Sequence, residues 1–404
     1  MNTEHNTAIK IINFGLLAFA VTSPLSLFGA EMCIVIVVFG WLYKIIKEKS
    51  LSWNKSPIDI FIVVYLATQF SASLISIAPA DAVRATLDTE WPMFLFFAVV
   101  NNLRDEKVIR KIVYCMILFS VFASMYALWE YFSGWDIIRQ KKLAVLSDIA
   151  HYRAEGFFEF YLTFAGYISV VLLISIGLLA SVTTVKEKIF LSVASTILFL
   201  AILATYARSM LLALAFVGII FAVLKGKKNG LIILATGIIM FFFLSFFIPS
   251  FYNRATSAFS ASENIDRINV YKTCINIAKD YPFFGVGVEN FLLYYDHYKV
   301  PGNKLRSPHN DYFNALVNSG IIGVSAFLLM WGAFLYFCIK EFYKMPDSFH
   351  KNLLLGCLLG IIALLLGSMF QGYYTDIENG MQWWFIAGIA MTIVSKEKIR
   401  RESQ

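Results

Sequence analysis

Charged residues are scarce in this sequence. Of its 404 residues, 59% are hydrophobic and only 15% are Asp, Glu, Lys or Arg, and the mean hydropathy is +0.68. Soluble globular domains carry about 25% charged residues, so the composition excludes an ordinary soluble protein. Long apolar runs with few charges instead predict helices that cross a lipid bilayer.

Paired cysteines and metal-binding motifs are also missing. We expect the cysteines to be small apolar side chains within helices, because they show no CxxC or Cys/His spacing and are scattered over the chain as Cys33, Cys115, Cys274, Cys338 and Cys357. The sequence has no Walker loop, no HExxH pair and no DxD-type pair. We therefore expect neither a metal nor a cofactor.

Twelve apolar stretches are candidate membrane spans, because a helix needs about 20 apolar residues to cross a bilayer. They are Ile11–Ser26, Leu27–Ile46, Ile58–Ile77, Ala82–Val100, Val108–Trp129, Phe157–Val182, Ile189–Tyr206, Met210–Leu224, Leu231–Ile248, Ala315–Ile339, Leu353–Phe370 and Gln382–Val394. The fourth is the weakest, because Arg84, Asp88 and Glu90 crowd its first half. No signal-peptide cleavage site follows the first, so we expect that helix to be retained. The sequence thus predicts an all-α polytopic membrane protein.

Positive charge alternates along the chain. The net charge of +7 would suit a nucleic-acid partner, but the basic residues gather in every second short connection between spans. The positive-inside rule gives this pattern when the N-terminus is cytoplasmic. Removing the doubtful fourth span would invert every later loop and destroy the pattern, so we keep it. We expect membrane lipids around the protein and no nucleic-acid partner.

The longest polar segment runs from Pro249 to Asn318, between the ninth and tenth candidate spans. Within it, Ile265–Lys279 has apolar residues at helical spacing, and Phe291–Tyr295 is a second short apolar stretch. The aromatic content argues against disorder, so we expect a folded helical cap on the outer side. The chain then divides into helices 1–9 (residues 1–248), the cap (249–318), and helices 10–12 with a cytoplasmic tail (319–404).

The sharpest local pattern is Ser307-Pro308-His309-Asn310, at the entry to the tenth span. A histidine titrates near neutral pH, so His309 could take a proton from an attacking hydroxyl group. Asn310 could orient a side chain or a substrate by hydrogen bonding. The simpler alternative is a histidine that caps a helix or bridges polar groups there. Gly320 and Gly323 would let the following helix pack closely.

Arg208 interrupts an apolar run that extends from Ile189 to Leu224. An arginine there is unfavourable unless it meets water, an anion or a partner. Its planar guanidinium group has N–H donors that match the geometry of phosphate oxygens. Either a phosphate clamp or a residue that snorkels to lipid headgroups fits this position. Arg267 begins the predicted cap helix, where an ordinary solvated arginine is the simpler interpretation.

Three further charged residues are candidate substrate contacts. Arg306 lies three residues before His309, and Arg153 lies in the outer segment that precedes the sixth span. Asp376 lies in the short outer loop before the last span, where it could pair with an arginine or hold the base. Each could equally be a solvated surface residue.

Together these elements resemble the O-antigen ligases, within the wider O-antigen ligase and polymerase superfamily. The histidine element is similar to the family pattern His-[Asn/Ser/Gln]-x9-Gly-x2-Gly, and an Arg-x3-Leu element and an arginine ahead of a Gly-rich stretch match in the same order. The residues that carry the resemblance are Arg208, Leu212, Arg267, Pro282–Gly287, His309, Asn310, Gly320 and Gly323. The number of spans, the single dominant outer loop and the length agree, so the resemblance covers essentially the whole chain.

The resemblance implies a GT-C-like, metal-independent, inverting glycosyltransferase of the bacterial inner membrane with a periplasmic active site. The implied donor is a glycan on undecaprenyl diphosphate, and the implied acceptor is a sugar hydroxyl of lipid A-core in lipopolysaccharide biosynthesis. His309 would be the base, and Arg208 and Arg267 would hold the diphosphate. Asn310, Arg306, Arg153 and Asp376 would contact substrate or support the site.

Two other functions remain open from the sequence. An O-antigen polymerase joins lipid-linked repeats to each other, and polymerases usually divide basic residues between two large outer loops. One loop dominates here, yet the segment Glu130–Gly156 also carries basic residues. A lipid-linked glycan transporter would show polar groups at mid-membrane and duplicated halves, and the sequence shows neither.

Overall fold

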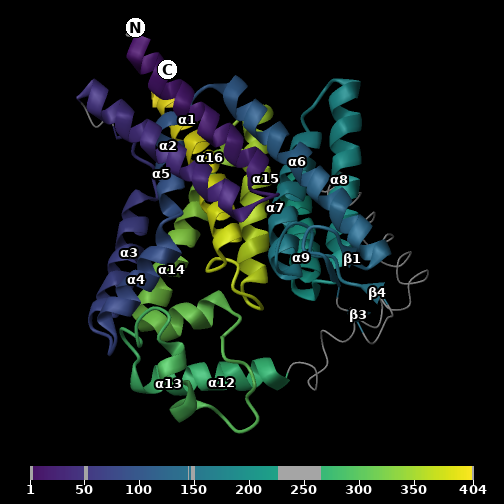
Figure 1. Cartoon of the computed structure of the whole chain (residues 1–404). Helices are drawn as coiled ribbons and strands as arrows, with labels where there is room; N and C mark the ends of the chain where they lie inside the picture. Colours follow the sequence, from purple (N-terminus) through teal and green to yellow (C-terminus); the bar gives the residue numbers. More distant parts are fainter. Residues whose placement is uncertain (1–2, 50–52, 144, 147–150, 226–264, 403–404) are drawn as a thin grey trace.

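The computed structural model describes residues 3–49, 53–143, 145–146, 151–225 and 265–402, and helices make up nearly all of its regular structure (Figure 1). The helices are α1 (Thr3–Thr22), α2 (Leu27–Glu48), α3 (Asp59–Leu74), α4 (Pro79–Glu90), α5 (Met93–Asn102), α6 (Glu106–Ser133), α7 (Tyr161–Leu179), α8 (Val185–Thr205), α9 (Arg208–Lys225), α12 (Ile265–Asp280), α13 (Phe291–Tyr298), α14 (Asp311–Lys344), α15 (Phe349–Gly367) and α16 (Ile377–Glu402). Two antiparallel pairs of two-residue strands lie between α6 and α7: β1 (Trp135–Asp136) with β2 (Lys141–Lys142), and β3 (Val145–Leu146) with β4 (His151–Tyr152).

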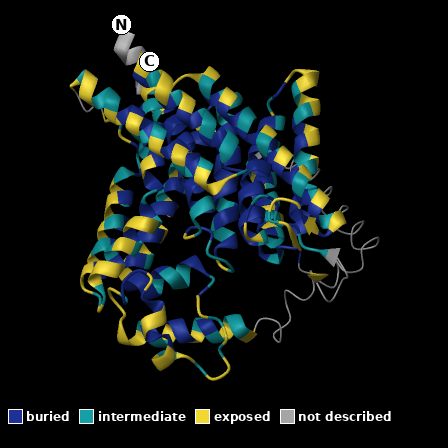
Figure 2. Ribbon diagram, in the orientation of Figure 1, coloured by how far each residue is buried: buried dark blue, intermediate teal, exposed yellow. Residues whose placement is uncertain are grey.

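The long helices form a bundle with both chain termini at one end, here called the terminal end (Figure 1). Helices α12 and α13 lie at the opposite end, here called the α12 end. Helix α7 packs against α8 and α15, α16 packs against α5 and α15, and α14 packs against α3. The interior helices are mostly buried, whereas exposed residues cover the outer helices and both ends (Figure 2).

Small residues allow α7 and α15 to approach closely at the centre of the bundle. A Cβ atom at Gly177 would lie 2.8 Å from the Asn352 carbonyl oxygen, and one at Gly356 would lie 2.6 Å from the Ile174 Cα atom. Such backbone contacts are typical of helices packed within membranes, where tight van der Waals contact replaces hydrophobic association.

Six helices of the described chain are long and apolar enough to cross a membrane: α2, α6, α7, α8, α14 and α15. Three more apolar helices are shorter, at Thr7–Thr22, Asp59–Leu74 and Arg208–Leu224. These helices confirm an all-α polytopic membrane protein. Twelve spans remain a prediction, and the ninth candidate, Leu231–Ile248, and residues 249–264 of the predicted cap lie outside the described residues.

The prediction of one continuous fourth span, Ala82–Val100, is wrong. The stretch forms two helices, α4 and α5, which are joined at Trp91 and Pro92. Proline has no N–H group to continue the ladder of i to i−4 hydrogen bonds, and the chain instead passes through tighter i to i−3 bonds from Phe94 to Trp91 and from Leu95 to Pro92. The charged side chains of Arg84 and Asp88 remain exposed on α4.

The tenth span also differs from the predicted Ala315–Ile339. Helix α14 begins at Asp311 and is interrupted at Gly320, whose φ of 64° and ψ of −165° are not helical. The break leaves the Val317 and Asn318 carbonyls and the Ile321 and Ile322 N–H groups without their usual helical partners. The segment 282–287 supplies these partners: Val286 and Gly287 donate to the two carbonyls, and the Pro282 and Phe283 carbonyls accept from the two N–H groups.

The close contact between segment 282–287 and the break in α14 explains why residue 320 is a glycine. A Cβ atom there would lie 2.3 Å from the Phe283 carbonyl oxygen, and the positive φ is unfavourable for other residues. The glycine therefore permits a helix break, rather than only the close helix packing expected from the sequence.

Helices α12 and α13 share a small hydrophobic core with the first part of α14. Its buried members are Val270, Cys274, Ile277, Val286, Phe291, Tyr294, Tyr295 and Val317. The Tyr271 ring of α12 also stacks on the Phe313 ring of α14 at a centroid distance of 4.6 Å. The predicted helix Ile265–Lys279 is thus confirmed as α12, and it is packed against the start of α14.

Candidate functional site

Several elements meet at the α12 end: the starts of α9, α12 and α14, the segment before α7, and residues 368–376 between α15 and α16. The predicted residues His309, Asn310, Arg208, Arg267, Arg153 and Asp376 all lie on these elements. Their mutual arrangement determines which chemistry this end can support.

His309 is held immediately before α14. Its backbone is left-handed, with φ 48°, a conformation that is uncommon for residues other than glycine and is often found at functional sites. The half-buried imidazole has its Nδ1 atom 3.3 Å from Oε1 of Gln371. A carbonyl oxygen can only accept a hydrogen bond, so this contact places the proton on Nδ1 and leaves the lone pair on Nε2.

The surroundings of His309 favour its neutral form. Burial lowers the pKa of the imidazole below its ordinary value of 6.5, and the positive charge of Arg267 acts in the same direction. The contact with Gln371 opposes these effects only in part. His309 is therefore unprotonated at neutral pH and is able to accept a proton.

Asn310 is the N-cap residue of α14. Its Oδ1 atom accepts hydrogen bonds from the N–H groups of Tyr312 and Phe313, and its Nδ2 atom donates to the Met369 carbonyl at 2.7 Å. These bonds fix the start of the helix and hence the backbone of His309. The geometry favours a positioning role for Asn310 over the substrate contact expected from the sequence.

Asp311 ties the segment 368–376 to α14. Its buried carboxylate accepts hydrogen bonds from the Ser368 hydroxyl at 2.6 Å, the Tyr374 N–H at 2.8 Å, and both the N–H and the hydroxyl of Thr375. This segment also carries Gln371, so Asp311 indirectly sets the position of the side chain that faces His309.

Two arginines near the start of α9 lie within electrostatic range of each other. Arg208 is the first residue of α9, and the Arg153 guanidinium lies 3.9 Å from the centroid of the Tyr161 ring. Burial lowers the pKa of Arg153, Tyr161 opposes this, and the positive charge of Arg208 lowers it further. Two neighbouring like charges in a half-buried place favour the binding of an anion.

Tyr373 links this arginine pair to Arg267. The Tyr373 side chain is fully buried, and burial raises the pKa of its hydroxyl. Ser209, next to Arg208, and the positive charge of Arg267 both act to lower this pKa, so both lie near the Tyr373 ring. The positive charge of Arg267 also acts on His309, so Arg267 lies within electrostatic range of both Tyr373 and His309.

Hydrogen bonds to a buried carboxylate hold the loop that carries Arg153. Glu130 at the end of α6 accepts hydrogen bonds from the N–H groups of Glu155 and Gly156, at 3.0 and 2.6 Å. The Ala154 N–H donates to the Ala204 carbonyl at the end of α8. These bonds hold Arg153 beside the turn that leads into Arg208.

Two predicted contacts have other surroundings. Arg306 is exposed, 5.9 Å from the centroid of the Tyr295 ring on α13, and it faces the charged side chain of Asp296. Asp376 precedes α16 and accepts hydrogen bonds from the Thr163 hydroxyl at 2.7 Å and from the Asn379 N–H and amide at 3.0 Å. Burial raises the pKa of Asp376. We assign it a capping role.

Sequence reasoning missed Gln371 and Tyr373. Both lie in the segment Gln371-Gly372-Tyr373-Tyr374, which follows an apolar run and precedes Asp376. The local signal was a set of polar and aromatic residues at a span end, which also fits an aromatic belt at the membrane surface. Only the folded chain brings Gln371 to His309, 62 positions earlier.

Comparison with known proteins identifies what the chain is similar to. Residues 193–328 match the family model described as O-antigen ligase, and this range holds Arg208, Arg267 and His309. The teichuronic acid biosynthesis protein TuaE of Bacillus subtilis (strain 168) is 23% identical over 364 residues, which cover 85% of this chain and 73% of TuaE. These comparisons confirm the predicted resemblance to the O-antigen ligases, and the apolar helices show a multi-pass membrane protein.

Proposed function

We propose that the protein is an O-antigen ligase, which transfers an O-antigen glycan from undecaprenyl diphosphate to a sugar hydroxyl of lipid A-core. The observation that carries the proposal is the neutral His309 imidazole, held by Gln371 at 3.3 Å and within electrostatic range of Arg267, at the same end of the bundle as Arg208. A base beside a cationic anion site is what an attack on a sugar–diphosphate bond requires.

In this mechanism Nε2 of His309 accepts the proton of the acceptor hydroxyl while its oxygen attacks the anomeric carbon of the donor sugar. The bond from that carbon to the phosphate oxygen breaks, and undecaprenyl diphosphate leaves with the bonding electron pair. Attack opposite to the leaving group inverts the anomeric configuration. Gln371 fixes the imidazole tautomer throughout, by accepting from the Nδ1–H group.

Arg208 and Arg267 stabilise the negative charge that grows on the departing diphosphate, and Arg153 adds to their field. Preorganised charges of this kind contribute most where water is partly excluded, and losing one such donor typically slows a reaction by about 100- to 1,000-fold. Arg153 and Arg267 are half-buried, so their charges are less screened than those of exposed arginines.

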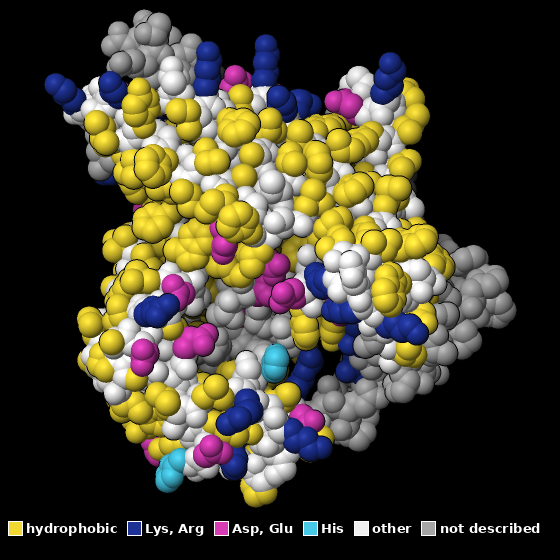
Figure 3. Space-filling model, viewed as in Figure 1, with side chains coloured by type: hydrophobic (Ala, Val, Ile, Leu, Met, Phe, Trp, Pro, Cys, Tyr) yellow, Lys and Arg dark blue, Asp and Glu magenta, His cyan; other side chains and the backbone are white. Residues whose placement is uncertain are grey.

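We further propose that the α12 end faces the periplasm of the bacterial inner membrane. Lys and Arg side chains line the terminal end with few acidic neighbours, the α12 end carries both signs of charge, and hydrophobic side chains cover the middle of the molecule (Figure 3). The positive-inside rule assigns such a basic end to the cytoplasm. A lipid-linked donor in the outer leaflet would then present its diphosphate at the level of the arginine group.

An O-antigen polymerase is the second candidate function. Arg153 comes from the shorter outer segment and joins Arg208 from α9, so basic residues of two separate segments serve one site. The name of TuaE also associates a relative with teichuronic acid, a different polysaccharide. A polymerase would use the same base and arginines, with a second lipid-linked glycan as the acceptor.

The test is a transfer assay with the purified full chain in lipid nanodiscs. Undecaprenyl-diphosphate-linked glycan is supplied with lipid A-core, or alone, and products are resolved by electrophoresis. We expect glycan on lipid A-core in the first reaction and no elongated lipid-linked glycan in the second. Elongation in the second reaction would establish the polymerase. Absence of bond formation in both reactions, with transport of the glycan by the same protein in sealed proteoliposomes, would exclude both functions.

A further inference from the structure

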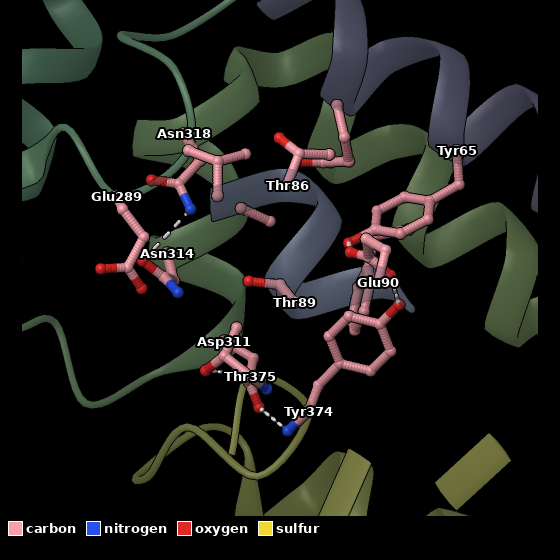
Figure 4. A pocket seen from close by; sticks show the side chains of 14 residues that line it. Tyr65, Thr86, Thr89, Glu90, Glu289, Asp311, Asn314, Asn318, Tyr374 and Thr375 are labelled. Carbon is pink, nitrogen blue, oxygen red and sulfur yellow. Dashed lines mark hydrogen bonds between the residues drawn. The ribbon is translucent and has the colours of Figure 1, made fainter. Parts of the chain in front are cut away.

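A cavity of about 550 Å³ lies at the terminal end, between α1, the last turns of α2 and α5, and the loop that leads into α6. Cavities that bind small molecules typically measure about 300–1,000 Å³. The cleft between α3, α4 and α14 has instead a volume of about 20 Å³, room for about one water molecule (Figure 4). Hydrogen bonds from the chain itself already reach the Glu90 and Asp311 carboxylates in that cleft. Of these two spaces, only the first, here called the α2–α5 cavity, has room for a ligand.

Two cationic side chains line the α2–α5 cavity, and both are held at the end of α5. The Lys44 ammonium donates to Asn102 Oδ1 at 3.1 Å, and the Arg104 guanidinium donates to Asn54 Oδ1. Asn54 is in turn fixed to Asn101, through its N–H at 2.7 Å and its side-chain amide at 3.1 Å. Within the described chain these partners of the two cations are neutral oxygens, so most of their N–H donors are available to an anionic ligand.

Two carboxylates line the same cavity. Glu48 lies about one turn after Lys44 on α2, and Asp105 follows Arg104 and caps α6 by accepting from the Lys107 N–H at 2.8 Å. The charges of these four lining side chains sum to zero, with both signs present. An anion alone would meet two carboxylates, and a cation alone would meet a lysine and an arginine. A molecule that carries both a phosphate and an ammonium group matches both signs.

The cavity lies at the depth of lipid headgroups. Helix α2 is long and apolar enough to cross a membrane, and Lys44 and Glu48 are in its last two turns. Trp53, which directly precedes Asn54, is 40% exposed and packs on Trp41 at a centroid distance of 5.9 Å. Tryptophan side chains gather at the level where a membrane meets water. A phospholipid beside α2 would therefore carry its headgroup to the level of the cavity.

We propose that the α2–α5 cavity binds the headgroup of a zwitterionic phospholipid with a primary ammonium group, such as phosphoethanolamine. Its phosphate accepts hydrogen bonds from Lys44 and Arg104, and its ammonium group donates to Glu48 and Asp105. The bound headgroup joins α2 to the connection between α5 and α6, which Lys396 of α16 also holds by donating to the Arg104 carbonyl at 2.9 Å. The site lies at the opposite end of the bundle from His309, so it does not depend on the proposed glycosyl transfer.

The experiment measures thermal unfolding of the full chain in a nonionic detergent while lipid is added. The lipids are phosphatidylethanolamine, phosphatidylcholine and phosphatidylglycerol with identical acyl chains, and soluble phosphoethanolamine is a fourth probe. We expect phosphatidylethanolamine to raise the unfolding temperature by several degrees, because a ligand that binds the folded state stabilises it. The choline lipid should bind about 10-fold more weakly, because its methylated ammonium cannot donate to carboxylates.

Variants of the lining test the two signs of charge separately. Lys44→Met and Arg104→Gln should each weaken binding of phosphatidylethanolamine by about 10-fold, the effect of losing a hydrogen bond to a charged group. Asp105→Asn keeps a residue that caps helices but removes one carboxylate, so it should shift the preference toward the anionic phosphatidylglycerol. Lys111→Met is the matched control, since Lys111 is an exposed lysine of α6 that does not line the cavity.

Three results would overturn the site. Equal stabilisation by all three lipids, unchanged in the variants, would show a general effect of lipid. Lower unfolding temperatures of Lys44→Met and Arg104→Gln without lipid, with wild-type lipid affinity, would show that the two cations only stabilise the C-terminal end of α5. Stabilisation by soluble phosphoethanolamine and by none of the lipids would assign the cavity to a water-soluble ligand.

Discussion

The two ends of the helix bundle use arginine differently. At the terminal end, Arg401 pairs with buried Glu341 through two hydrogen bonds, and Arg400 pairs with Glu397 at 3.0 Å. At the α12 end, Arg153 and Arg208 are close enough for one positive charge to act on the other. Opposite charges stabilise each other without a ligand, whereas like charges held together favour an added anion.

This difference predicts a division of labour. Substituting Arg401 should lower stability and leave transfer intact, whereas substituting Arg208 should lower transfer. Measuring the unfolding temperature and the transfer rate on the same variants tests this division, beginning with the largest expected effect.

His309→Ala removes the proposed base. We expect the transfer rate to fall by about 100- to 10,000-fold, the range typical of a general base, with no loss of thermal stability. The measurement is transfer of glycan to lipid A-core under conditions that saturate the donor. Asn310→Ala is the comparison variant, because it removes the helix cap that positions His309 and should also lower the unfolding temperature. Full activity of His309→Ala would remove the base from the mechanism.

Arg208→Ala should slow the maximal transfer rate by about 100- to 1,000-fold, because the arginine stabilises charge on the departing diphosphate. The unfolding temperature is measured on the same variant, to separate a loss of transfer from a loss of folding. Arg306→Ala is the matched control, since Arg306 is exposed near α13 and should affect neither quantity. Equal activity losses in both variants would show that arginines at this end act only through general charge.

Arg401→Ala tests the opposite end. The substitution leaves the buried Glu341 carboxylate without its partner, which should destabilise the protein by about 1.5–3 kcal/mol. Thermal unfolding measures this loss, and the transfer rate at a temperature where the protein stays folded should be normal. Arg84→Ala is the control, because its ion pair with Asp88 is exposed on both sides and should contribute little. A loss of transfer in Arg401→Ala without unfolding would contradict the division between the ends.

Gln371→Glu should have the smallest effect, a change in pH dependence. The wild-type imidazole has a lowered pKa, so the transfer rate should fall only below pH 6.5, as His309 becomes protonated. A carboxylate beside Nδ1 favours the imidazolium, so the acid limb of kcat/KM should move by about one pH unit to higher pH. Gln371→Met, of similar length and without charge, should lower the rate without that movement. Identical profiles in all three proteins would exclude contact between Gln371 and the base.

Much of the helical framework could be predicted from the sequence, because apolar runs and the alternation of basic loops are properties of local composition. The start of α9 at Arg208 and the amphipathic helix α12 are examples. The fourth span was wrong because the alternation of basic loops was given more weight than Pro92, the local signal for the break. The interruption at Gly320 was missed because its cause, the segment 282–287, lies more than 30 positions earlier.

The candidate site was likewise predictable from the sequence only in part. His309, Arg208 and Arg267 stand in short motifs that can be recognised one at a time. Gln371 has no motif of its own, and its relation to His309 exists only after α15 returns the chain to the α12 end. Asp311 follows the histidine motif, but its role depends on hydrogen-bond donors from residues 368, 374 and 375. Residue type predicted the chemical groups, and tertiary contacts determine which of them act together.

The break in α14 has a mechanical consequence. Segment 282–287 and the interrupted turn complete each other's backbone hydrogen bonds, so separating them would leave four main-chain groups unpaired. Each such group is costly away from water, by several kcal/mol in a lipid environment. The segment after α12 and the helix that follows His309 should therefore travel as one rigid body. Substrate entry must then come from rearrangement elsewhere, and crosslinking segment 282–287 to α14 should leave turnover unchanged.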